Sequence, residues 1–385
     1  MKNAINYFYG FSIENLRMIN DDYYFNYKNK NFTFQQLKEE YYDYNMMLRL
    51  NNLMLNNNSS FYQIILNRNN EIATKINNKQ YILLQENFNT DRTFDLFDII
   101  NTNIPVNTGD KNKIEWIRLW EKKIDYFEMY LEHNKGKYLN LNKFANYFIG
   151  MGESAILYAK NTLNDTIPKI YDRSVISHKR INTDKSYKDL YNPLLLMIDH
   201  PSRDVSEYFK EIYFKNSLQV SKIKEYLEQV SFSDYGARLL MARMLFPSFF
   251  FDNFEKLVDS KISNSEITRI VDKMSGYEKY LFKILNILKQ KYNIPEIEWL
   301  KKADYSSTLI TPSTSGTSFT SIDSIPSFNV TSIMLQWLQA PNNFIYTIPS
   351  SNLINSMFPP SLNKKGLILS IISIILFSVF INITN

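Results

Sequence analysis

The sequence predicts an α+β protein with a small β-rich N-terminal lobe, a mostly helical C-terminal lobe and an irregular tail. Short segments of alternating apolar and polar residues occur in the first hundred positions. Longer segments with apolar residues at helical spacing follow, and the last 83 residues carry only four charged side chains. The expected boundaries are 1–100 for the first lobe, 101–113 for a connector, 114–302 for the second lobe, 303–363 for a Ser/Thr/Pro-rich linker and 364–385 for an apolar tail.

The N-terminal lobe is predicted to contain a hairpin, one helix and three further strands. Residues 22–34 alternate around an Asn/Lys turn, which is typical of a β-hairpin. Apolar residues at helical spacing predict a helix over 35–55. Further strands are expected at Tyr62–Asn67, Glu71–Ile76 and 80–86.

Helices account for most of the predicted C-terminal lobe. An apolar stripe predicts a helix over 114–133, and a second helix over 141–161 contains a Gly-Met-Gly run that suits close packing. Residues 168–198 interrupt the helices with short β-like pieces. The aromatic run at 246–254 is expected to belong to the core. Further helices are expected at 205–215, 218–229, 233–250 and 264–292.

Composition and motifs exclude several kinds of site. The absence of cysteine excludes disulfides and Cys-ligated metal centres. The net charge of +5 is spread thinly, so we expect no nucleic-acid partner. The sequence contains no GxGxxG, P-loop, HExxH or GxSxG motif. Because the N-terminus lacks an apolar signal-peptide core, we expect synthesis in the cytoplasm without Sec export.

The apolar end of the tail has three interpretations. Residues 366–381 are sixteen residues without a charge, which span about 24 Å as a helix, against about 30 Å for the hydrocarbon core of a membrane. The first interpretation is a membrane anchor, with Lys364 and Lys365 on the cytoplasmic side. The second is an apolar tail without fixed structure, and the third is a segment that does not belong to the native protein.

One stretch of the sequence is more specific than the rest. "VISHKRINTDK" at 175–185 precedes "LLLMIDHPSRDVSEYF" at 194–209, in which an apolar run ends on Asp199. This pattern is typical of a catalytic or metal-binding strand end, and equally of an ordinary one. His178 and His200 lie nearby, but a zinc site with Asp199 is a minor alternative because no fourth ligand is visible. We expect His200 to be an exposed turn residue.

These residues, together with the order of the lobes, resemble the kinase fold. The first run lies where aminoglycoside-phosphotransferase-like kinases carry H-G-D-x-x-x-x-N, and the second where they carry an apolar strand ending in I-D. With "YFIGMGESAILYAKN" at 147–161 and "YGARLLMARMLFPSFFF" at 235–251, the chain is similar to YutH-type spore coat proteins, kinase-like relatives of the CotS-type coat proteins. The resemblance covers roughly residues 1–302. It implies location in the spore coat, with other coat proteins as partners.

The resemblance also implies a role for each residue of the stretch. His178 takes the place of the histidine that supports the catalytic loop through hydrogen bonds. The catalytic aspartate falls on Arg180, which stays protonated and cannot act as a base. The metal-binding asparagine falls on Lys185, and the second metal ligand falls on Asp199, which is retained. Asp204 is expected to be the N-cap of the following helix.

The small lobe departs from the kinase pattern in the same way. Gln85 falls in place of the nucleotide-binding lysine, and the hairpin tip at 67–71 has no glycine to let a backbone approach phosphates closely. We therefore expect no catalytic residue, no cofactor, and only a vestigial metal site at Asp199. The sequence favours a non-catalytic coat protein acting in coat structure or assembly. Two alternatives stay open: a divergent ATP- and Mg²⁺-dependent small-molecule or protein phosphotransferase, and a membrane-tethered binding protein that uses 366–381.

Overall fold

The computed structural model describes most of the first 305 residues, and these belong to one compact unit. The described ranges are 1–38, 42–57, 61–87, 92–107, 115–134, 139–215 and 220–305. Within these ranges, no helix has the length and apolar character needed to cross a membrane. The membrane anchor expected at 366–381 and nearly all of the linker expected at 303–363 lie outside the described residues.

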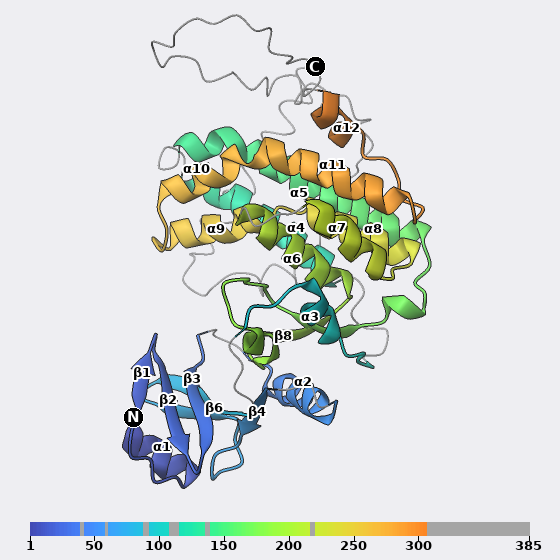
Figure 1. Ribbon diagram of the computed structural model, residues 1–385. Coiled ribbons are helices and arrows are strands. Elements are labelled where there is room, and N and C mark those ends of the chain that lie inside the picture. The colour runs from blue at the N-terminus through green and yellow to red at the C-terminus, as the bar shows by residue number, and fades with distance from the viewer. Residues whose placement is uncertain are drawn as a thin grey trace, which may run out of the picture. The chain divides into compact units, whose positions relative to one another are not determined.

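The N-terminal lobe is a six-stranded antiparallel sheet with a helix against each face (Figure 1). The strands run in the order β1-β2-β3-β6-β4, and β5 also pairs with β6. Helix α1 (Lys2–Tyr9) packs Ile5 on one face, and helix α2 (Tyr44–Asn56) packs Leu50 on the other. The strands are β1 Arg17–Ile19, β2 Asp22–Tyr27, β3 Lys30–Gln36, β4 Tyr62–Ile65, β5 Ala73–Ile76 and β6 Lys79–Glu86.

Two-residue turns join three of the hairpins. Both residues of Asn20–Asp21, Lys28–Asn29 and Asn77–Asn78 have positive φ. Two successive residues of this kind make a type I′ turn, whose twist matches that of the paired strands, and asparagine tolerates this conformation better than most residues do. The hairpin predicted at 22–34 is confirmed, with its turn at the Asn/Lys residues.

Helix positions in the N-terminal lobe differ from the sequence prediction. Strand β3 continues to Gln36, which pairs with Tyr81, so the helix expected over 35–55 begins only at Tyr44. There the Asp43 side chain accepts the Met46 amide and caps the helix. Helix α1 is absent from the prediction, as is α3 (Leu96–Asn101), which contacts α6 of the C-terminal lobe, because each is too short to show a clear periodic pattern.

The C-terminal lobe contains nine helices and a two-stranded sheet in the described part of the chain. Helix α8 is buried on all sides and contacts both α5 and α6. The helices are α4 Glu115–His133, α5 Leu139–Asp165, α6 Ser202–Phe214, α7 Val220–Gln229, α8 Asp234–Leu245, α9 Ser248–Val258, α10 Asn264–Asp272, α11 Met274–Lys289 and α12 Glu298–Tyr305. The sheet pairs β7 Val175–His178 with β8 Leu196–Asp199.

Two predicted helices of this lobe are each divided in two. The helix expected over 233–250 ends before Pro247, whose ring removes a backbone donor and disfavours a continuous helix. The helix expected over 264–292 is interrupted at Lys273, whose carbonyl oxygen accepts a hydrogen bond from the Tyr213 hydroxyl at 2.8 Å. The helices over 114–133 and 141–161 and the β-like pieces within 168–198 are confirmed, with small shifts of their ends.

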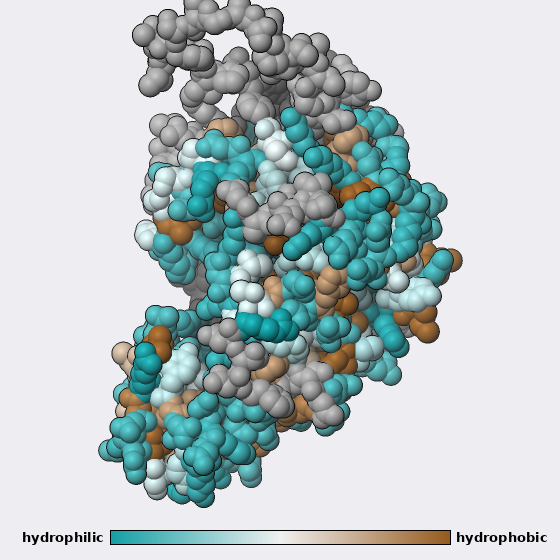
Figure 2. Space-filling model, in the orientation of Figure 1, coloured by the Kyte–Doolittle hydropathy of each residue, from teal (hydrophilic) through white to brown (hydrophobic). Residues whose placement is uncertain are grey.

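The aromatic run at 246–254 lies in the core, as predicted. Phe250 is fully buried and stacks on Phe148 of α5 with 3.6 Å between ring centroids. The large apolar residues left exposed include Ile167 and Ile170, which precede β7. On the face shown in Figure 2, hydrophobic residues form small separate groups among hydrophilic ones.

Gly152 and Gly150 form a matched pair for testing how closely α4 and α5 pack. A Cβ atom at Gly152 would lie 2.9 Å from Cδ1 of Ile124, whereas one at Gly150 would meet nothing within 4 Å. We expect Gly152→Ala to lower the free energy of unfolding by about 1–3 kcal/mol through overpacking. Gly150→Ala should raise it by about 1 kcal/mol through helix propensity. Urea denaturation measures both changes, and equal changes would contradict close packing at Gly152.

Candidate functional site

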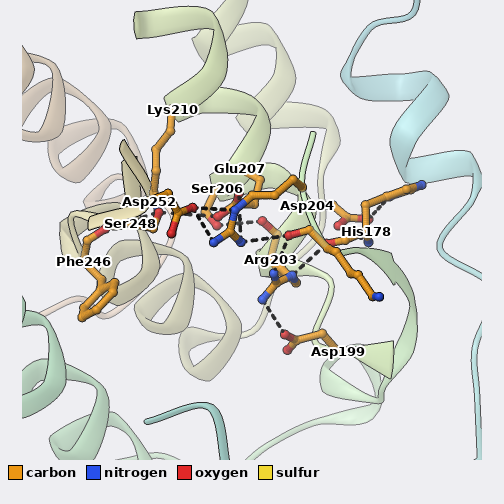
Figure 3. A network of polar contacts seen from close by, with 12 residues as sticks. His178, Asp199, Arg203, Asp204, Ser206, Glu207, Lys210, Phe246, Ser248 and Asp252 are labelled. Atoms are coloured by element: carbon orange, nitrogen blue, oxygen red, sulfur yellow. Dashed lines mark hydrogen bonds and ion pairs between the residues drawn. The ribbon is translucent and has the colours of Figure 1, made fainter. Parts of the chain in front are cut away.

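Strands β7 and β8 and the start of α6 bring most of the predicted site residues together. The two strands are antiparallel, and α6 begins at Ser202, three residues after β8 ends. His178 ends β7, Asp199 ends β8, and Arg203 and Asp204 lie in the first turn of α6. Figure 3 shows these side chains within one network of polar contacts.

Two arginines hold the carboxylate of Asp199. Its Oδ1 accepts a hydrogen bond from Nη2 of Arg243 at 2.6 Å, and its Oδ2 accepts one from Nη1 of Arg203 at 3.3 Å. The Asp199 side chain is only 8% exposed. Mg²⁺ needs carboxylate oxygens that are open to it, and here guanidinium groups occupy both oxygens. The site therefore does not fit a divalent cation, and no group of three or more potential metal ligands occurs among the described residues.

Arg243 reaches Asp199 from the buried helix α8. Its guanidinium carbon lies 4.4 Å from the centroid of the Trp116 ring, so the side chain is stacked on an aromatic face as well as paired with a carboxylate. The side chain is 4% exposed. A buried carboxylate and guanidinium stabilise each other only while both are present, so this contact fixes the end of β8 to the centre of the helical lobe.

Arg203 connects Asp199 to the backbone that follows β7. Its Nε donates to the carbonyl oxygen of His178 at 2.8 Å, and its Nη2 donates to that of Lys179 at 2.8 Å. A planar guanidinium can make these bonds and the bond to Asp199 together. Arg203 thus fixes the loop that would carry the catalytic base in an active kinase.

Asp204 is not the N-cap of α6, contrary to the sequence prediction. Helix α6 begins two residues earlier, so Asp204 lies inside its first turn. Its fully buried carboxylate accepts three hydrogen bonds, each 2.9 Å long, and none comes from the first turn of α6. The donors are the backbone amide and Nδ1 of His178 and the side-chain amide of Asn103. Pro201, two residues after the end of β8, already has helical φ and ψ and is the N-cap residue of α6, so the helix starts before Asp204.

His178 is buried and supports the loop through hydrogen bonds from both ring nitrogens. In addition to the Asp204 contact, its Nε2 lies 2.9 Å from the carbonyl oxygen of Leu190. The ring therefore joins the end of β7 to α6 and to the short 3₁₀ helix Tyr187–Tyr191. This is the structural role that the kinase resemblance implies for His178.

Arg180, onto which the kinase resemblance places the catalytic base, is paired with carboxylates of two helices. Its Nη2 lies 2.6 Å from Oδ2 of Asp252 on α9, and its Nη1 lies 3.7 Å from Oε2 of Glu207 on α6. Burial opposes the charge, but these two carboxylates raise the pKa of Arg180 above its ordinary value. Lys185, at the metal-binding asparagine position, is exposed in the following turn. Neither side chain supplies a base or a metal ligand.

Lys210 is a buried cation that lies near Glu207, one of the two carboxylates paired with Arg180. Its Nζ lies 2.9 Å from the Ser248 hydroxyl and 3.3 Å from the Phe246 carbonyl oxygen, and 3.7 Å from Oε1 of Glu207 (Figure 3). Burial lowers its pKa to about 8. At neutral pH it remains mostly protonated and links α6 to the start of α9.

His200 is buried, and the prediction of an exposed turn residue is wrong. Its Nδ1 accepts the Ser202 amide at 3.1 Å and contacts the Ser202 hydroxyl at 2.8 Å, while Nε2 lies 3.2 Å from Oδ1 of Asp172. The Ser233 hydroxyl, which caps α8, donates to the other oxygen of Asp172 at 2.6 Å. His200 is therefore turned into the helical lobe, where it does not meet His178 in a zinc site.

Gln85 does not take the place of the nucleotide-binding lysine. That lysine lies on the third strand of a kinase sheet, whereas Gln85 lies on β6. In the register of β3 and β6, Gln85 is opposite Phe32 and so shares the face that packs against α1. The opposite face carries Gln35, which contacts the C-terminal lobe. The prediction failed because the sequence alone did not identify which strand is third.

Residues 187–192 contact the N-terminal sheet directly. Nζ of Lys188 lies 3.5 Å from Oε2 of Glu86, and the Asn192 side-chain amide donates to Oε1 of Gln35 at 3.1 Å. The Tyr191 ring lies 4.8 Å from that of Phe61, measured between centroids. These contacts join residues 187–192 to β3, to β6 and to the residue before β4.

Sequence reasoning missed the residues that engage the site from distant helices. Arg243 is 44 positions from Asp199, and Asp252 is 72 positions from Arg180. Both lie in or beside strongly apolar helices, and a charge within an apolar helix is the signal that could have marked them. The partner of each could not be identified without the fold.

Comparison with known proteins places the chain in a family. A family model described as "Spore coat putative kinase YutH" matches residues 2–285. The endospore coat-associated protein YutH of Bacillus subtilis (strain 168) is 27% identical over 210 residues, and the match covers 49% of this chain and 62% of that protein.

Comparison with solved structures supports the fold. The aminoglycoside phosphotransferase of Alicyclobacillus acidocaldarius superposes with a TM-score of 0.55 at 7% identity, over 75% of this chain and 97% of that one. The likeness confirms the kinase-like two-lobe fold predicted from the sequence, and at this identity it shows the fold alone. With its family model matched over most of its length, the chain belongs to the YutH family of kinase-like spore coat proteins.

Proposed function

We propose that this chain acts in the spore coat as a non-catalytic, kinase-shaped protein with a role in coat structure or assembly. The observation that carries the proposal is the pairing of Asp199 with Arg243 and Arg203. In an active kinase the aspartate at this position binds Mg²⁺. Here two fixed positive charges neutralise it from within the protein.

The position of the catalytic base supports the same proposal. An active kinase has an aspartate there to accept the substrate hydroxyl proton. Arg180 cannot accept a proton, and its pairing with Asp252 and Glu207 gives it a structural role. Loss of a general base alone typically lowers a rate by about 10²–10⁴-fold.

The N-terminal sheet adds a third argument. Strand β3 contains one lysine, Lys30, which shares the face of Phe32 that packs against α1. The other face presents Thr33 and Gln35, and Gln35 is bonded to Asn192. A lysine that could hold nucleotide phosphates is therefore absent from the relevant face of β3, so the residues do not fit ATP.

The coat role rests on the family. Its description and the name of the Bacillus subtilis relative both refer to the spore coat. Because the match spans 62% of that relative, what the relative does as a whole enters here only as a proposal. We propose other coat proteins as the partners, with no cofactor and no nucleic acid involved.

Two assays on the full chain test this function: one for nucleotide binding and one for phosphate transfer. We expect the melting temperature to stay unchanged in millimolar ATP with Mg²⁺, whereas a nucleotide present at 100 times its Kd would stabilise the protein by about 2.7 kcal/mol. Labelled phosphate should not pass from ATP to the chain or to extracted coat proteins. Transfer that disappears in a folded Asp199→Asn variant would contradict the proposal and favour a divergent phosphotransferase.

A further inference from the structure

His178 lies between two hydrogen-bond acceptors in the interior of the C-terminal lobe. Its Nδ1 is 2.9 Å from Oδ2 of Asp204, and its Nε2 is 2.9 Å from the carbonyl oxygen of Leu190. A carbonyl oxygen cannot donate a hydrogen bond, so Nε2 carries a hydrogen. Because the residue is only 1% exposed, water has little access to replace either contact.

The surroundings of Asp204 require a hydrogen on Nδ1 as well. The same carboxylate accepts the His178 backbone amide and the Asn103 side-chain amide, both at 2.9 Å. Hydrogen bonds from several donors favour the ionised form of a carboxyl group. With an acceptor beside each ring nitrogen, the surroundings of His178 suit the imidazolium form, in which both Nδ1 and Nε2 carry a hydrogen.

The charged groups that face the ring come from α6. Asp204 attracts the imidazolium, and Arg203, which is bonded to the His178 carbonyl oxygen, repels it. Leu196, opposite on β8, and Leu190 bring no charge. Burial alone would lower the pKa of His178, but the Asp204 charge and the hydrogen bonds to Asp204 and Leu190 outweigh it and raise this pKa above 6.5.

The imidazolium holds the segment that also contacts the N-terminal lobe. Leu190 is part of the 3₁₀ helix Tyr187–Tyr191. Two positions before it, Lys188 pairs with Glu86, and two positions after it, Asn192 bonds to Gln35. Leu190 therefore lies between two residues that contact the β-sheet.

We propose that His178 is a proton-operated latch that couples residues 187–192 to helix α6. A neutral imidazole has a single N–H, and the negative charge of Asp204 keeps that hydrogen on Nδ1. The lone pair of Nε2 then faces the Leu190 carbonyl oxygen and repels it. Loss of the proton releases Leu190 and loosens the contacts of residues 187–192 with Glu86 and Gln35.

The direction of the pH dependence follows from linkage. The pKa of His178 is higher in the folded chain than the 6.5 of an ordinary histidine. The stabilisation by the latch is then fully present below pH 6.5 and is lost as the pH rises through the folded pKa. Residues 187–192 are expected to be most firmly held in mildly acidic solution.

An NMR titration of the full chain with ¹⁵N-labelled histidine, combined with hydrogen exchange, tests the latch. We expect the His178 ring to titrate above pH 6.5. The protection factors of amides 187–192, corrected for intrinsic exchange, should fall roughly tenfold over the same pH range, as expected for one charge-assisted hydrogen bond. His133→Gln, a change at an exposed histidine of α4, is the matched control and should leave both results unchanged.

Two results of this experiment would overturn the latch. One is a His178 midpoint at or below pH 6.5, and the other is protection of residues 187–192 that does not change as His178 titrates. His178→Gln gives a second readout, since it should remove the step in protection, whereas His133→Gln should leave that step in place. If that variant does not fold, the titration of the unaltered chain decides alone.

Discussion

Asp204→Ala should lower the free energy of unfolding by about 3–5 kcal/mol, which is the typical cost of removing one partner of a buried ion pair. The substitution leaves the buried imidazolium of His178 without its counter-ion. It also removes the acceptor of the His178 backbone amide and of the Asn103 side chain. Urea denaturation followed by circular dichroism measures the change as a shift in the transition midpoint.

Asp184→Ala is the matched control for this loss. Its carboxylate pairs with Lys215, but its side chain is 74% exposed. Exposed pairs are typically worth about 0–1 kcal/mol, so this variant should unfold close to the midpoint of the unaltered chain. If the two variants lost similar amounts of stability, Asp204 would not be the buried centre of the network.

Arg243→Ala should lower the free energy of unfolding by a similar amount, again about 3–5 kcal/mol. It removes the closest charged partner of Asp199, at 2.6 Å, and the side chain that stacks on Trp116. Both the lost charge pair and the lost packing of a long side chain contribute. Thermal and urea unfolding of the variant, in the absence of ligands, measure the effect.

A double-mutant cycle separates the charge pair from the packing. Arg243→Met keeps an apolar side chain of similar length beside Trp116, and Asp199→Asn keeps the shape of the aspartate. The two changes together should cost less than the sum of the single changes, with a coupling of about 0.5–3 kcal/mol for groups in contact. Strict additivity would contradict a direct interaction between Arg243 and Asp199.

Much of the fold could be predicted because local chemistry decides it. The hairpin at 22–34 has strands in which apolar and polar residues alternate. Its turn residues are Lys28 and Asn29, and asparagine readily adopts the positive φ that such a turn requires. The helices over 114–133 and 141–161 have continuous apolar stripes. The strand that ends on Asp199 is an apolar run closed by a polar residue. In each case a few neighbouring residues carry the signal.

The errors lie where distant residues decide the outcome. Whether 35–55 begins as strand or helix depends on Tyr81, which pairs with Gln36 and extends β3. The burial of His200 depends on Asp172, 28 positions away. Asp204 was expected to cap its own helix, but its partners are on β7 and in the connector. No local pattern contains these pairings.

The site was predicted in its position but not in its contacts. His178, Arg180 and Asp199 lie together as expected, and the contacts of Arg180 with Asp252 and Glu207 could not be read from the sequence. The pairing of Asp199 with Arg243 needed the position of α8, which only the fold supplies. Asp199 is thus joined to α8 and to the start of α6 by two guanidinium groups.

The binding of Mn²⁺ with ATP to the full chain, followed by the electron paramagnetic resonance signal of free Mn²⁺, tests the central claim most directly. The claim is that the Asp199 carboxylate is paired with Arg243 and Arg203 and does not bind a metal–nucleotide complex. We expect the free Mn²⁺ signal in the presence of ATP to be the same with and without the protein. Saturable loss of that signal, abolished in a folded Asp199→Asn variant, would contradict the claim.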